Sequence, residues 1–113
     1  LGGARFDHSL ANIEVLQYLL AHNCRGVMAD SHTKVFLISD SRLRLTQMKG
    51  ATVSVFPYNG SNCNVSYTGL LYPLDHASLT AGGILMGVSN SVTEDVAEIR
   101  VHIGTALVVV YQE

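Results

Sequence analysis

The stretch VAEIRVHIGTALVVVY, residues 96–111, indicates a β fold more clearly than any other part of this 113-residue chain. Its apolar residues predict two strands, over residues 96–103 and 106–111. Gly104 and Thr105 separate these runs, and a glycine at such a place is typical of a tight turn. We therefore expect the two runs to pair with each other as an antiparallel hairpin.

Other short strands are predicted upstream of this stretch. Leu43 and Leu45 alternate with polar residues, as in a half-buried strand. Between the remaining candidates lie turn signals such as the Asn-Gly pair at residues 59–60. Those candidates are the runs at residues 26–29, 34–38, 52–56, 65–67, 70–72 and 83–88. Six or seven short strands with regular turns predict a mainly β fold, an antiparallel sandwich or barrel.

The first forty residues have a different pattern. Apolar residues from Leu10 to Leu20 form a helical stripe, which predicts a helix over residues 9–23. We expect residues 1–40 to be the end of an α/β nucleotide-binding domain, and residues 41–113 to be a separate β domain. The chain begins at Leu1, with no strand ahead of its first glycines, so we expect the rest of the α/β domain to lie upstream.

Composition excludes several classes of protein. The net charge is −2, which does not suggest a nucleic-acid or membrane surface. No apolar run approaches the ~18 residues of a membrane span. Cys24 and Cys63 lack metal-ligand spacing, and so do the four histidines after His8. We expect a cytoplasmic protein with reduced thiols, and its low charged fraction of 14% favours a second buried face such as a subunit interface.

The stretch LGGARFDHSLAN, residues 1–12, has the residue types of a phosphate site. Gly3 allows the backbone to come close to a ligand, and Arg5 carries a planar fork of donors that suits phosphate. Asp7 stands where the helix would begin, and the unpaired N–H groups of a helix start attract anions. From the residues alone, Asp7 is equally a helix N-cap, and Arg5 a surface ion-pair partner.

Four motifs resemble those of the thiamine pyrophosphokinases, enzymes that transfer a pyrophosphoryl group from ATP to thiamine. Their order and spacing are similar to the family's across nearly the whole chain. Leu71 stands where many relatives carry lysine, and Ala81 where an aromatic residue is common. The motifs are GARFDHSLAN at residues 3–12, TGLLYPL at 68–74, LTAGG at 79–83 and GVSN at 87–90.

The resemblance implies an α/β nucleotide-binding domain, a thiamine-binding β-sandwich and a homodimer with active sites between its subunits. It implies that Asp7 is catalytic and binds Mg²⁺, and that Gly3, Arg5 and His8 contact ATP phosphates. The family's other metal-binding aspartates lie upstream, so we expect this chain alone to be inactive. The thiamine contacts that the resemblance implies are Thr68, Gly69, Tyr72, Ser89 and Asn90.

Alternatives remain at each level. Tyr72 is equally suited to a sandwich core, Ser89 and Asn90 to a plain turn, and His8 to a structural role. For the whole protein, one alternative is a non-catalytic β-sandwich that binds a small ligand or only dimerises. A second alternative is a diphosphotransferase that acts on a different alcohol.

Overall fold

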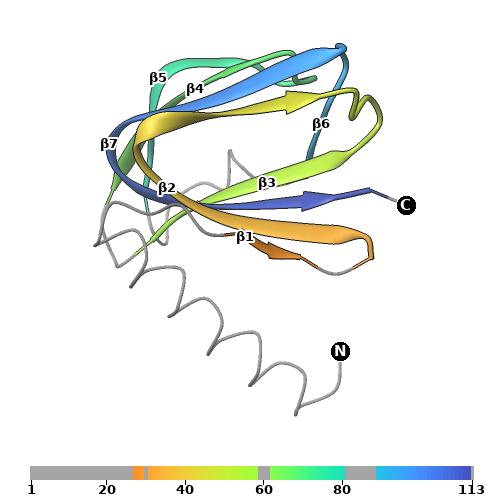
Figure 1. The fold of residues 1–113 in the computed structure, drawn as a ribbon. Helices are drawn as coiled ribbons and strands as arrows, with labels where there is room; N and C mark the ends of the chain where they lie inside the picture. The colour runs from red at the N-terminus through yellow and green to blue at the C-terminus, as the bar shows by residue number, and fades with distance from the viewer. Residues whose placement is uncertain (1–26, 30, 59–61, 81–88, 113) are drawn as a thin grey trace.

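The computed structural model describes residues 27–29, 31–58, 62–80 and 89–112 (Figure 1). These residues form a seven-stranded sheet in which every pairing is antiparallel, which confirms the mainly β fold class. The helix expected over residues 9–23, the turn at 59–60 and the strand at 83–88 lie outside the described residues. The strands are β1 (Val27–Ala29), β2 (Thr33–Thr46), β3 (Thr52–Pro57), β4 (Cys63–Thr68), β5 (Leu74–Leu79), β6 (Asn90–Ser91) and β7 (Val96–Tyr111).

β7 is the central strand of the sheet. β2 pairs along one side of it over almost the whole length of both strands. On its other side, β4 pairs with the first half of β7 and β3 with the second half. β1, β6 and β5 then extend the sheet beyond β2, β3 and β4. The sheet curls over, so the half with β4 and β5 lies above the half with β1 and β3 (Figure 1).

The curl arises where both long strands bend. The β2–β7 pairing shifts register between Ser39 and Ser41, and Asp40 between them has a positive φ of 48°. Gly104 of β7 has a φ of 81°. An extra residue in a strand bends it and moves its inward-facing side chains by one position. The inward face accordingly passes from residues 97, 99 and 101 to residues 106, 108 and 110 in β7.

The hairpin expected at residues 104–105 is wrong, because β7 is one strand whose two halves both pair with β2. The glycine was recognised, but its role differs. A Cβ at Gly104 would collide with the carbonyl oxygen of Asn62 and lie 3.2 Å from the Cβ of Cys63. Glycine with a positive φ serves bulges as well as hairpin turns, and here it lets β4 approach the bend of β7.

Three other expectations change in detail. The run at residues 34–38 and the alternating stretch around Leu43 and Leu45 are joined in β2, so the junction expected between residues 40 and 41 lies within a continuous strand. The domain division at this point stays a prediction. Residues 70–72 form a single bridge, between Leu70 and Val92, instead of a strand. β5 follows directly, at a place where no strand was expected.

The core fills the space between the two layers. It consists mainly of β-branched and aliphatic side chains, with Tyr67 among them, and each large apolar side chain contributes about 1.5–3 kcal/mol when fully buried. A smaller cluster, with Val35 and Leu37 at its centre, packs with Tyr58, Leu107 and Val109. The largest residues of the main core are Tyr67, Leu70, Ile38, Leu43, Leu45, Val53, Val55, Val65, Leu79, Val92, Ile99, Val101, Val108 and Val110.

Candidate functional site

The five residues implied for ligand contact by the downstream motifs lie on two segments, residues 68–72 and 89–93, which run side by side. The N–H of Leu71 donates a hydrogen bond to the carbonyl oxygen of Ser91, 2.8 Å away. The N–H of Thr93 donates to the carbonyl oxygen of Gly69, 2.9 Å away. Motifs separated by about twenty residues in the sequence therefore share one wall of the molecule.

Gly69 shapes the first segment. It has a positive φ of 76°, and a Cβ there would lie 2.5 Å from the carbonyl oxygen of Val96. The backbone can pass this close to the start of β7 only because residue 69 has no side chain. The Thr93 hydroxyl also donates to the Gly69 carbonyl oxygen, at 3.2 Å. The glycine of this motif thus sets the path of the chain toward Tyr72.

Asn90 joins the two segments through its side chain. Its Oδ1 accepts the Tyr72 N–H at 2.9 Å, and its Nδ2 donates to the Tyr72 carbonyl oxygen at 2.8 Å. The same Oδ1 accepts the Ser91 N–H at 3.0 Å. Among the residues that the structure describes, Asn90 is the one polar side chain in the buried class, with 2% of its surface exposed. Buried amides keep their place through such hydrogen bonds, so this residue is part of the frame.

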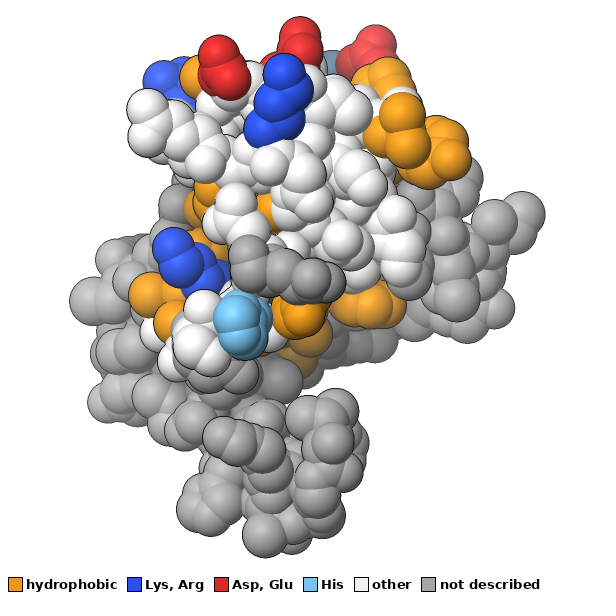
Figure 2. All heavy atoms as spheres, turned by 90° about the vertical axis from the view of Figure 1, so that its right-hand side faces the viewer, with side chains coloured by type: hydrophobic (Ala, Val, Ile, Leu, Met, Phe, Trp, Pro, Cys, Tyr) orange, Lys and Arg blue, Asp and Glu red, His pale blue; other side chains and the backbone are white. Residues whose placement is uncertain are grey.

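Tyr72 points in the opposite sense, toward solvent, with 63% of its surface exposed. The alternative that places it in the core is therefore wrong. Its neighbour Leu71 is 53% exposed, and Val96 at the start of β7 is equally exposed. Figure 2 shows hydrophobic side chains gathered near the upper edge of one face, with acidic side chains beside them. An exposed aromatic ring with its backbone fixed on both sides suits the stacking of a flat ligand.

Ser89 and Thr68 lie at the ends of the two segments. Ser89 is exposed, has a positive φ of 58°, and its N–H donates to the hydroxyl oxygen of Ser54 on β3. Thr68 is exposed at the end of β4, where it pairs with Glu98 of β7. Both short polar side chains are available to a ligand at the edge of the sheet. Sequence reasoning missed Ser54 and Thr93, because neither belongs to a motif that was recognised.

Gly3, Arg5, Asp7 and His8, the residues expected to bind phosphate and metal, lie outside the described residues. Within the described ranges, no three His, Cys, Asp or Glu side chains gather closely enough to hold a metal ion. The same ranges contain no helix with the length and hydropathy needed to cross a membrane.

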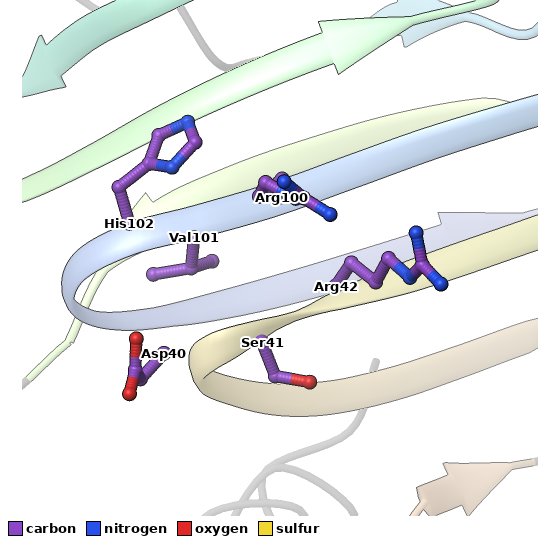
Figure 3. Close-up of a pocket in the computed structure, with 6 residues that line it drawn as sticks. All are labelled: Asp40, Ser41, Arg42, Arg100, Val101 and His102. Atoms are coloured by element: carbon purple, nitrogen blue, oxygen red, sulfur yellow. The ribbon is translucent and has the colours of Figure 1, made fainter.

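A separate cavity of about 370 Å³ lies at the bend of β2 and β7 (Figure 3). Two of its lining residues, Arg42 and Arg100, stand directly opposite each other on neighbouring strands. Glu98 lies between three guanidinium groups at N···O distances of 3.6, 3.7 and 3.9 Å, where it offsets their repulsion. The sequence pattern gave no sign of this charged face, because its members come from two distant strands. The cavity is lined by Asp40, Ser41, Arg42, Arg100, Val101 and His102.

Two histidines stack beside this cavity. The rings of His76 and His102 lie 4.0 Å apart between centroids and 9° from parallel. His102 Nε2 is 2.8 Å from the Ser66 hydroxyl oxygen, which also accepts the His76 N–H at 2.9 Å. His76 Nδ1 is 2.7 Å from an Asp75 carboxylate oxygen. These contacts hold the irregular pairing of β4 with β5 in place, close to the Tyr72 segment in the sequence.

Two buried groups on β4 have shifted pKa values. Burial raises the pKa of the Cys63 thiol, which is a free cysteine. Burial, and then the nearby Cys63, raise the pKa of the Tyr67 hydroxyl far above its usual range. The Tyr67 hydroxyl oxygen is buried without a hydrogen-bond partner. Both groups therefore stay neutral in the folded protein at physiological pH, and neither is activated for chemistry.

Comparison with known proteins gives a consistent picture. The family described as "Thiamin pyrophosphokinase, vitamin B1 binding domain" matches residues 40–108. Thiamine pyrophosphokinase 1 of Oryza sativa subsp. japonica is 30% identical over 101 residues, which are 86% of this chain and 37% of the rice protein.

Solved structures share the fold. The thiamine pyrophosphokinase of Bacillus subtilis superposes with a TM-score of 0.85 at 20% identity, over 100% of this chain and 53% of that protein. The enzyme of Candida albicans superposes with a TM-score of 0.76 at 14% identity, over 100% of this chain and 42% of that one. The chain therefore spans about half, or less, of the length of these proteins.

Proposed function

The chain belongs to the thiamin pyrophosphokinase family through its vitamin B1-binding domain, and on this premise we propose that it is the thiamine-binding part of such an enzyme. The whole enzyme would transfer pyrophosphate from ATP to thiamine, giving thiamine diphosphate and AMP. The observation that carries this proposal is the exposed ring of Tyr72, whose backbone is held on both sides by the buried amide of Asn90.

Thiamine has two flat rings, and one of them carries a positive charge. We propose that one ring lies against the face of Tyr72, where stacking and cation–π attraction contribute about 0.5–2 kcal/mol. Leu71 offers an exposed apolar side chain beside it, in place of the lysine common in relatives. Ser89 and Thr68 supply hydroxyl groups at the two ends of the site, and these can hydrogen-bond the polar edge of the pyrimidine. Gly69 lets the backbone form the wall between them.

The phosphate half of the site is proposed to lie on residues 1–12. Asp7 would hold Mg²⁺ by its carboxylate, a hard oxygen ligand that this ion prefers, while Arg5, Gly3 and His8 would contact ATP phosphates. A bound Mg²⁺ neutralises charge on the phosphates during transfer. Further acidic ligands would come from the segment upstream. We propose a cytoplasmic homodimer in which this β domain faces the nucleotide domain of the other subunit.

Calorimetry of the intact protein with thiamine tests the proposal. We expect saturable binding that weakens at least tenfold in Tyr72→Ala and is largely kept in Tyr72→Phe, since phenylalanine retains the ring. Tyr111→Ala is a matched control, because Tyr111 is also an exposed tyrosine but lies at the far end of β7. If the wild-type protein does not bind thiamine, the proposed thiamine site is rejected, and a β domain that acts only in dimer formation is favoured. If Tyr72→Ala leaves thiamine binding unchanged, thiamine binds at a site that does not include Tyr72.

A further inference from the structure

We infer that Asn90 is a positioning residue, which acts on thiamine through the backbone of Tyr72 and makes no direct contact with it. The inference deepens the thiamine-binding function proposed above and rests on it. It assigns different roles to Ser89 and Asn90, whereas the family resemblance implies that both contact thiamine.

The hydrogen-bonding capacity of Asn90 is nearly used up inside the protein. An amide side chain has an acceptor oxygen with two lone pairs and two N–H donors. Both lone pairs of Oδ1 are engaged, by the N–H groups of Tyr72 and Ser91, and one donor is directed to the Tyr72 carbonyl oxygen. One N–H remains, on a side chain that is only 2% exposed. A ligand at the surface has no access to the polar atoms that an asparagine would use for recognition.

Two of these three bonds fix Tyr72 in space. An N–H and a C=O of one residue, both held by a single rigid amide, leave the peptide units on either side of Tyr72 little freedom to rotate. Leu71 is tied in parallel by its own bond to Ser91, at 2.8 Å. The Tyr72 ring therefore projects from an immobile base although it is 63% exposed. A binding surface that is already ordered costs less conformational entropy when the ligand arrives.

Two substitutions of Asn90 disturb these hydrogen bonds in different ways. Asn90→Ala leaves the N–H and C=O of Tyr72 without their partner, and the loop can then open to water. Asn90→Asp keeps an acceptor for the N–H groups but places a carboxylate oxygen against the Tyr72 carbonyl oxygen, which repels it. Ser89→Ala is the matched control on the adjacent residue, since it removes a side chain that the proposal places against the ligand and leaves the Asn90 bonds intact.

Amide hydrogen exchange tests the clamp without any ligand. This chain contributes five tyrosines, so ¹⁵N-tyrosine labelling keeps its amide signals few, and the signal of residue 72 is identified by its loss in Tyr72→Phe. We expect exchange at Tyr72 to accelerate at least tenfold in Asn90→Ala and to stay unchanged in Ser89→Ala. Because thiamine is absent, this result is independent of the proposed function. Unchanged exchange at Tyr72 in Asn90→Ala would overturn the inference.

A double-mutant cycle then tests the route to thiamine. Asn90→Ala should weaken thiamine binding about tenfold in the wild-type background and less than twofold in a Tyr72→Ala background, because the residue through which it acts is gone. Equal factors in both backgrounds would show direct contact and overturn the inference. If Asn90→Ala does not fold, Asn90→Asp is used in the same cycle with the same criterion. If the wild-type protein fails to bind thiamine, the proposed function is rejected. The exchange experiment still decides whether Asn90 holds Tyr72.

Discussion

Ser39 and Gly104 connect the bends of the two longest strands: the Ser39 hydroxyl donates a hydrogen bond to the Gly104 carbonyl oxygen, 3.2 Å away. β2 and β7 therefore turn together, and the two layers of the curled sheet keep a fixed relation. The close approach of Gly104 to Asn62 and Cys63 adds β4 to the same junction. The stability of the fold should depend strongly on this point.

Gly104→Ala should lower the free energy of unfolding by at least ~2 kcal/mol, because the new Cβ has no room and the positive φ disfavours alanine. Gly50→Ala is a suitable control. Its φ of 93° is also positive, but a Cβ there meets no atom within 4 Å, so it reports the backbone cost alone. Urea unfolding of both variants measures the difference. Equal losses would mean that crowding at the bend contributes nothing.

Tyr67→Phe should raise the free energy of unfolding by about 1 kcal/mol. The Tyr67 hydroxyl is buried without a hydrogen-bond partner, and burial of an unpaired polar group costs free energy that phenylalanine does not incur. Chemical denaturation of the variant measures the gain, with the exposed Tyr72→Phe as comparison. A loss of stability would reveal that the hydroxyl has a partner in solution.

The stability of the protein should fall as the pH rises above about 9. Cys63 and Tyr67 have raised pKa values in the folded state, and their ordinary values are 9.0 and 10.0. The unfolded chain releases these protons as the pH passes the ordinary values, whereas the folded protein retains them. Their contribution is therefore complete below pH 9 and is lost above it. Between pH 7 and 11, the free energy of unfolding should fall less steeply with pH for Tyr67→Phe than for the wild type. Identical slopes for the two proteins would contradict this account.

Glu98→Gln should destabilise the protein modestly, by about 1 kcal/mol or less, since the arginines around it are half exposed and solvent screens the interaction. Loss of the carboxylate leaves Arg42, Arg44 and Arg100 to repel one another. Added salt should thus restore more stability to this variant than to the wild type. Glu94→Gln, at an exposed acidic position before β7, serves as control. A salt response equal to that of the control would argue against a shared role for Glu98.

Asp7→Asn and Tyr72→Ala should affect the proposed activity in different ways if the two halves of the site are assigned correctly. In the full-length protein, Asp7→Asn should reduce kcat far more than it weakens thiamine binding, since it acts on the phosphates. Tyr72→Ala should weaken thiamine binding with a smaller change in kcat. Steady-state kinetics with varied thiamine separates the two, and parallel effects on both parameters would refute this division of roles.

Local patterns in the sequence predicted most of the strand positions. The alternation around Leu43 and the apolar runs of β3 and β4 were sufficient for that purpose. They could not show that two neighbouring runs belong to one continuous strand, as they do in β2 and β7. Gly104 looks like a chain reversal locally, and only the pairing of both halves of β7 with β2 turns it into a bend within a longer strand. Long-range pairing overrides the local turn signal, and no local pattern reports it.

The resemblance assigns the downstream motifs to one candidate site, which stays a prediction, and it does not tell which of their residues are exposed. Motif resemblance picked out Tyr72 and Asn90 together, and the structure brings their segments side by side. The motif could not show that one of them is exposed and the other buried. Burial depends on how Asn90–Thr93 packs against the turn after β4, which is a property of the folded sheet. The charged face at Glu98 was missed for the same reason.

The central place of β7 also has a consequence for biosynthesis. β2, β3 and β4 all take their main partner from residues 96–111, which leave the ribosome after each of them. Until then these earlier strands present unpaired edges, and pairings between residues so far apart form slowly. The nascent domain therefore has to remain unaggregated through most of its own translation. A stalled ribosome or a stop codon before residue 96 would yield a chain whose strands have lost their common neighbour, a species suited to chaperone capture or degradation.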